Sequence, residues 1–148
     1  MSETLKIVVP TDFSDASLAV MDWVRRLSER GHVQVHAISV VQEPMMYMPV
    51  MAGAAVGSMP TVGELEKITQ ANLDTFVEQH MSDFAEPPIA TAVVGRPADA
   101  ITEYANKIGA QMIVIATRGH SRLEHALLGS VAEGVVRHAE CPVLTVRS

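Results

Sequence analysis

The chain has 148 residues, of which 48% are hydrophobic, and a formal net charge of −6 at pH 7. This length fits one globular domain over residues 1–148, with enough apolar material for a core. The negative charge disfavours nonspecific binding to nucleic acids or to anionic membranes. No apolar run approaches the ~18 residues of a membrane span, and the N-terminus shows no secretory signal. Because a single cysteine also fits a reducing compartment, we expect a cytoplasmic protein.

Apolar residues alternate between strand-like and helix-like patterns along the whole chain. Five short apolar runs predict strands at residues 5–10, 33–41, 89–94, 111–116 and 142–146, which we expect to be buried on both faces. Between them, apolar residues recur at helical spacing: Val20, Trp23, Val24 and Leu27; Leu65, Ile68, Leu73, Phe76 and Val77; Ile101, Tyr104, Ala105 and Ile108; Val131, Val135 and Val136.

Several helix boundaries also carry local signals. Ser14 offers an N-cap hydroxyl to the first helix, and residues 61–64 have the spacing of a capping box before the second. Pro97 suits the first turn of the third helix. Gly31 and Gly109 are expected to end the first and third helices, because glycine readily adopts the left-handed conformation found there.

Residues 42–60 differ from the rest of the chain. This segment holds five of the nine methionines, three prolines and two glycines, and it follows a predicted strand. We interpret it as a long, mobile loop, which could serve as a lid or an adaptable contact surface, or be an insertion without a role of its own.

The order β-α-β-α-β-α-β-α-β predicts an open, twisted, parallel five-stranded sheet with helices on both faces. In such α/β sheets, ligands bind beyond the carboxyl ends of the strands, where the strand order reverses. The first and fourth strands end at Pro10 and Ala116. If these strands are neighbours, the loops that follow them meet at one edge of the sheet.

Glycines mark the loop after the fourth strand and the start of the last helix. Gly119 follows the strand closely, and Gly129 and Ser130 precede the apolar residues of the helix. Glycine lets backbone N–H groups approach an anion, and a helix start adds unpaired donors and a favourable dipole. This arrangement predicts a site for a polyphosphate.

Four segments together resemble the universal stress protein family. They are residues 7–14, 95–101, 113–130 and 135–144, and the similarity runs over essentially the whole chain. The resemblance implies a Rossmann-like fold of the adenine nucleotide alpha hydrolase-like type, and a homodimer formed through the C-terminal strand. ATP-binding members carry Gly, two residues, Gly, nine residues, then Gly and Ser or Thr. Here Gly119, Gly129 and Ser130 match, whereas Ala116 replaces the first glycine.

The resemblance also implies a set of ATP-binding residues. It places adenine and ribose near Pro10, Thr11 and Asp12, the base at Val40, ribose and phosphates at Ile115, Ala116, Arg118 and Gly119, and the terminal phosphates at Gly129, Ser130, Val131 and Ala132. Asp12 and Ser130 have an alternative role as helix N-caps, and Arg118 could instead be a solvated loop residue. The methyl group of Ala116 costs little if its φ is negative, but it clashes or strains the loop if φ must be positive or if a base or ribose packs on its Cα.

The hypothesis that these residues favour is a cytoplasmic stress-response regulator that binds ATP, with or without Mg²⁺, and acts on an unknown protein partner. One alternative is a dimeric interaction module that binds no nucleotide, and another is a slow ATPase. We expect no enzyme, because no general base is evident, and no metal site, because His120 and His125 lack ligand spacing. Cys141 is expected to be a packing residue rather than a reactive thiol.

Overall fold

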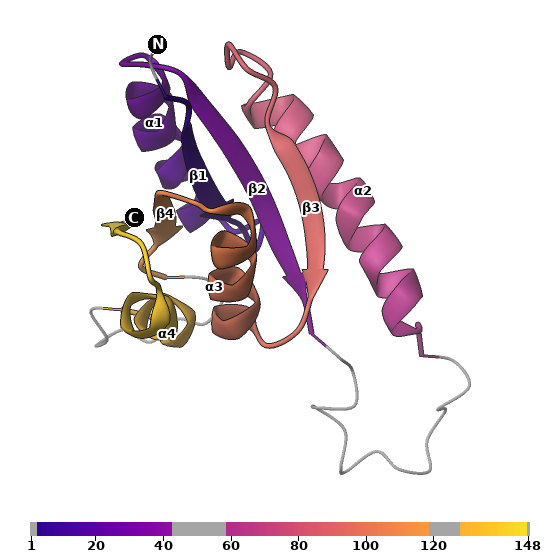
Figure 1. Cartoon of the computed structure of the whole chain (residues 1–148). Coiled ribbons are helices and arrows are strands. Elements are labelled where there is room, and N and C mark those ends of the chain that lie inside the picture. The colour runs from indigo at the N-terminus through magenta and orange to yellow at the C-terminus, as the bar shows by residue number, and fades with distance from the viewer. Residues whose placement is uncertain (1–2, 43–58, 119–127, 148) are drawn as a thin grey trace.

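The computed structural model describes residues 3–42, 59–118 and 128–147, in which strands and helices alternate (Figure 1). The elements are β1 (Leu5–Pro10), α1 (Asp15–Ser28), β2 (Val33–Val41), α2 (Val62–His80), β3 (Ile89–Val94), α3 (Pro97–Ile108), β4 (Met112–Ala116), α4 (Ser130–His138) and β5 (Val143–Val146). Residues 43–58 lie outside the described residues, so the interpretation of 42–60 as a mobile loop stays a prediction.

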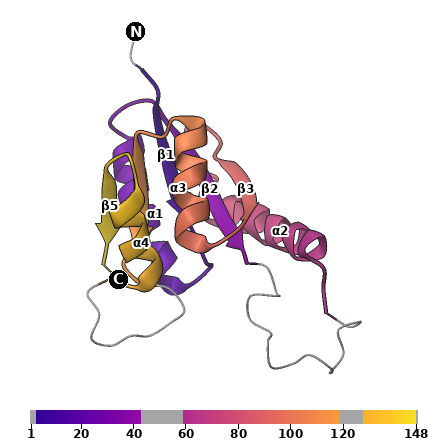
Figure 2. The ribbon, with the colours of Figure 1, turned by 60° about the horizontal axis from the view of Figure 1, so that its bottom comes forward.

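The strands form one sheet in the order β3-β2-β1-β4-β5, and every neighbouring pair is parallel. The predicted fold class is therefore confirmed. β1 lies at the centre, where Ile7 pairs with Met112 of β4 and Pro10 pairs with Ile38 of β2. Because β1 and β4 are neighbours, the loops that follow them leave the sheet side by side. β5 and α2 lie at opposite sides of the molecule (Figure 2).

Helices cover both faces of the sheet, with α3 and α4 in front and α1 behind in Figure 1. Alternate residues of β1 point to opposite faces, as the pleat of a strand requires. Ile7 and Val9 join a core with Val20 and Val24 of α1 and with α2, whereas Val8 packs with α3 and α4. The two cores together hold the sheet between two helical layers.

The prediction of strands buried on both faces is wrong at the two edges. No residue of β3 is fully buried, and Ile89 is 45% exposed. Three predicted apolar helix positions are also exposed, namely Trp23, Ile68 and Val136. The buried stripe of α1 runs through Val20, Met21 and Val24 instead, which leaves Trp23 against the Arg26 guanidinium on the surface. Hydrophobic spacing predicts that a helix has an apolar side, but it did not predict which residues at the margin of that side contact the sheet.

The boundary signals were right for α2 and α3. For α1, Ser14 is the N-cap residue as predicted, although its hydroxyl makes no capping bond, and the predicted end at Gly31 is wrong. Thr61 and Glu64 form the predicted capping box, and Gly109 ends α3 in the left-handed conformation, at φ 69°. α1 ends at Ser28 rather than at Gly31, because Glu29 caps it in a right-handed conformation. The Ser28 hydroxyl donates to the Arg25 carbonyl over 2.7 Å, so these last turns need no glycine.

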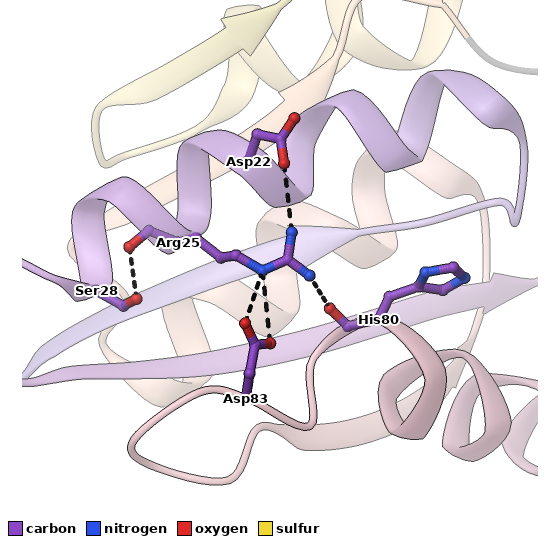
Figure 3. Close-up of polar contacts among 5 residues, drawn as sticks. All are labelled: Asp22, Arg25, Ser28, His80 and Asp83. Atoms are coloured by element: carbon purple, nitrogen blue, oxygen red, sulfur yellow. Dashed lines mark hydrogen bonds and ion pairs between the residues drawn. The ribbon is translucent and has the colours of Figure 1, made fainter.

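Arg25 ties the end of α1 to the end of α2 (Figure 3). Its Nε lies 3.2 Å from an Asp83 carboxylate oxygen, and its Nη1 lies 3.3 Å from Asp22. Nη2 donates to the His80 carbonyl, and the guanidinium lies over the Phe84 ring. A guanidinium presents several donors in one plane, so one side chain satisfies groups from both helices.

Cys141 is partly buried and packs against the core formed with α3 and α4. Burial raises the pKa of its thiol, which disfavours the reactive thiolate. Within the part of the chain that the structure describes, every helix is too short or too polar to cross a membrane.

His36 on β2 is a buried titratable group. Its Nδ1 lies 2.9 Å from the Tyr104 hydroxyl of α3, which in turn lies 3.4 Å from the Thr91 hydroxyl of β3. Burial lowers the pKa of His36 below its ordinary value of 6.5, and the positive charge of Lys6 lowers it further. The folded protein therefore favours the neutral imidazole.

This depressed pKa predicts a loss of stability in acid. As pH falls below 6.5, the unfolded chain binds a proton at His36 that the folded chain resists, so the free energy of unfolding decreases until the pH lies below the folded-state pKa. In His36→Gln, the decrease between pH 7.5 and 5.0 should be smaller than in wild type, as measured by urea unfolding. Equal decreases in the two proteins would contradict the prediction.

Candidate functional site

A pocket of about 420 Å³ opens at the carboxyl ends of the central strands. Eleven of the twelve predicted site residues line it: Pro10, Thr11, Asp12, Val40, Ile115, Ala116, Arg118, Gly129, Ser130, Val131 and Ala132. The twelfth, Gly119, lies outside the described residues. The structure thus brings together residues from four segments far apart in the sequence, at the edge where an α/β sheet places its ligands.

The loop after β1 is held by short polar contacts. The Thr11 N–H donates to the Ile38 carbonyl over 2.9 Å, and the Thr11 hydroxyl accepts from the Phe13 N–H over 3.0 Å. Oδ1 of Asp12 accepts from the Ser14 N–H at 3.0 Å and from the Ser17 hydroxyl at 3.2 Å. Ser14, not Asp12, is the N-cap of α1, so the alternative role of Asp12 as the N-cap is wrong. Asp12 instead holds Ser14 and Ser17 from the preceding loop while it lines the pocket.

Phe13 has a strained backbone at the rim of the pocket. It is the one non-glycine residue with positive φ among the described residues, at 65°. This conformation is costly for a bulky side chain, and the bond to Thr11 helps to hold it. The ring meets Phe76 of α2 edge to face, with 5.8 Å between ring centroids. The turn at Phe13 leads the chain from the pocket into α1.

The backbone at Ala116 answers the conformational part of the question raised by its methyl group. Ala116 is the last residue of β4, pairs with Val146 of β5, and does not have a positive φ. The first position of the glycine pattern is thus an extended strand end here, which alanine adopts without strain. The next residue, Thr117, is buried, and its N–H donates to the Val146 carbonyl over 2.9 Å.

Thr117 and Gly129 close the loop between β4 and α4. The Gly129 N–H donates to the Thr117 carbonyl over 2.6 Å. Gly129 is the N-cap of α4, with φ −66°, and as a glycine it has no side chain to cap the helix start. Ser130 is the first helical residue, so its alternative role as the N-cap is wrong. The N–H groups of a first helical turn have no partner within the helix, and here that turn lines the pocket.

The model of the universal stress protein family matches residues 3–147. The chain belongs to the universal stress protein family. It is 36% identical over 143 residues to Universal stress protein MJ0531 of Methanocaldococcus jannaschii, which covers 96% of this chain and 81% of the relative.

Two solved structures show the same fold as this universal stress protein. Protein MJ0577 of the same archaeon superposes with a TM-score of 0.78 at 25% identity, over 97% of this chain and 96% of the other. A universal stress protein solved in complex with cAMP superposes with a TM-score of 0.69, also at 25% identity, over 99% of this chain and 98% of the other.

Sequence reasoning missed several residues that line the pocket of this universal stress protein. They are Phe13, Ser17, Ser39, Gln42, Thr69, Pro97, Ile101 and Thr117. Most of them directly precede or follow predicted site residues or elements, so the strand ends could have suggested them. Thr69 lies in the middle of α2, and no local signal marks it, because only the packing of α2 against the sheet brings it to the pocket.

We predict that a side chain at position 129 destabilises the protein. A Cβ at this position would lie 3.1 Å from the Thr117 carbonyl oxygen, whereas a Cβ at Gly31 would have nothing within 4 Å. Gly129→Ala should therefore lower the free energy of unfolding by about 1 kcal/mol relative to Gly31→Ala, the matched control, in urea titrations. If both variants are equally stable, the Thr117–Gly129 contact does not constrain the loop.

Proposed function

We propose that this universal stress protein is a cytoplasmic regulator that binds an adenine nucleotide, with ATP as the expected ligand. The observation that carries the proposal is that the Asp12 loop and the start of α4 line one pocket, and that the N-cap of α4, Gly129, has no side chain. The carboxylate can accept hydrogen bonds from an adenine amine or a ribose hydroxyl. The helix start supplies N–H donors and the positive end of a dipole for phosphates.

The lining residues match both the base and the phosphates of a nucleotide in polarity and charge. Val40, Ile115 and Ile101 provide apolar surface for a base, and Arg118 supplies a positive charge for a phosphate. The complex of a structural neighbour with cAMP supports an adenine nucleotide as the ligand class. ATP, its pairing with Mg²⁺, and the assignment of single residues to base or phosphate are parts of the proposal.

The proposed activity is binding rather than catalysis. Asp12 is the one carboxylate that lines the described part of the pocket, and its Oδ1 already accepts bonds from Ser14 and Ser17. A general base for water at a terminal phosphate would have to stand at the α4 end of the pocket, whereas Asp12 belongs to the β1 loop. Nucleotide occupancy would then act through the shape or contacts of the protein.

A homodimer through β5 completes the proposal. β5 is an outer strand of the sheet, and its residues Val143–Val146 pair with β4 alone within the described sheet. An outer strand presents unpaired N–H and C=O groups along its free side, and a second copy of the same strand can satisfy them.

Nucleotide release and thermal stability test the binding proposal. Protein denatured after purification should release adenine nucleotide, and stripped protein should gain several degrees in Tm at saturating Mg-ATP, because a ligand that binds only the folded state stabilises it. Mg-GTP is the control and should give a smaller shift. Sedimentation velocity on the same samples reports the dimer. No released nucleotide and no shift at millimolar ATP would contradict the proposal.

Ala116→Gly tests the placement of the nucleotide. Because Ala116 lies in an extended strand and lines the pocket, removing its methyl group should leave ATP affinity equal or raise it by about threefold or less. Titration calorimetry measures the dissociation constant, and Gly129→Val, whose branched side chain enters the same loop, should abolish binding. Weaker binding by Ala116→Gly would show that the assignment of this loop is wrong.

A further inference from the structure

The two halves of α2 are attached to the sheet in different ways. From Leu73 onward the helix is anchored by apolar burial, since Leu73 and Phe76 belong to the core on that face of the sheet. None of residues 62–72 belongs to either core, and Ile68 is 54% exposed. Yet the half without core contacts carries Thr69, the contribution of α2 to the pocket.

One polar side chain fastens this first half. Oε1 of Gln70 accepts from the Ala92 N–H over 2.8 Å, and Nε2 donates to the Ala90 carbonyl over 3.0 Å. Nε2 also lies 3.0 Å from Oδ1 of Asp74, one helical turn further along α2. A carboxylate and a carbonyl both require a donor, so these partners fix which end of the carboxamide faces which group.

The two backbone contacts reproduce those of a neighbouring strand. Ala90 and Ala92 point their N–H and C=O groups to the same side of β3, and β3 is an outer strand, with β2 on its other side. A residue of a further parallel strand opposite Thr91 would donate to the Ala90 carbonyl and accept from the Ala92 N–H. The Gln70 carboxamide makes this same pair of bonds in its place, and α2 runs along this side of β3 (Figure 1).

We infer that Gln70 is a positioning residue, which holds the first half of α2 against β3 and so keeps Thr69 at the wall of the pocket. Gln70 and Thr69 are adjacent, so a helix that pivots away at Gln70 carries Thr69 with it. The inference rests on the proposed function where it concerns the nucleotide, whereas the attachment of α2 to β3 does not depend on any ligand.

Gln70→Met tests this role, because methionine keeps the length and helix propensity of glutamine but forms neither bond. Hydrogen exchange followed by NMR should show the Ala92 amide and the amides of residues 62–72 exchanging about tenfold faster, with residues 73–80 and the β1 core unchanged. Calorimetric titration should show ATP binding weakened by about three- to tenfold.

Two further variants sharpen the comparison. Gln79→Met is the matched control, because Gln79 lies exposed on the same helix, and it should change neither exchange nor affinity. Gln70→Glu keeps an acceptor for Ala92 but places a carboxylate oxygen against the Ala90 carbonyl and the Asp74 carboxylate, so its effects should be at least as large as those of Gln70→Met.

The two measurements separate the possible failures. If the Ala92 amide exchanges at the wild-type rate in Gln70→Met, or if all slow amides accelerate equally, the local attachment is overturned. If exchange accelerates locally but ATP affinity is unchanged, the positioning role at the pocket is overturned. If the wild-type protein binds no ATP, the proposed function fails and the positioning of Thr69 for a nucleotide fails with it, whereas the exchange data still decide the attachment.

Discussion

The parallel pairing of β1 with β4 is the constraint on which the rest of the site depends. This pairing places Pro10 and Ala116 at the same edge of the sheet, although more than a hundred residues separate them in the sequence. Both strands are buried in the middle of the sheet and carry the cores on its two faces. The described residues of the two loops that follow them then line one pocket.

Local hydrogen bonds hold the two loops that follow β1 and β4 in place. On the β1 side, Thr11 and Asp12 make short bonds to the turn that opens α1. On the β4 side, the bond from Gly129 to the Thr117 carbonyl joins the strand end to the helix start. These bonds satisfy polar groups at the loop ends. The first turn of α4 lines the pocket, and its N–H groups have no partner within the helix. Such a site can hold an anion without a cluster of cationic side chains.

α2 stands apart from the other helices because its contribution to the pocket comes from a half that lacks core contacts. Its far half is anchored by Leu73 and Phe76, and its near half by the polar contacts of Gln70 with the free edge of β3. Gln70 thus provides hydrogen-bond partners for the Ala90 carbonyl and the Ala92 N–H on the outer side of β3. Among the described residues, no side chain makes the corresponding pair of bonds to β5, the outer strand that the proposed dimer uses.

By itself, the sequence determined the order of the elements and the parallel sheet, because hydrophobic periodicity is a local property of the chain. The glycine spacing pointed to the polyphosphate end of the pocket, and the resemblance to the universal stress protein family supplied the eleven predicted residues that line it. The tertiary structure alone decided that Trp23 and Ile68 are exposed, that Ala116 has an extended backbone, and that Thr69 and Phe13 reach the pocket. These properties depend on how each helix rotates and docks against the sheet, and that docking is set by contacts between residues far apart in the sequence.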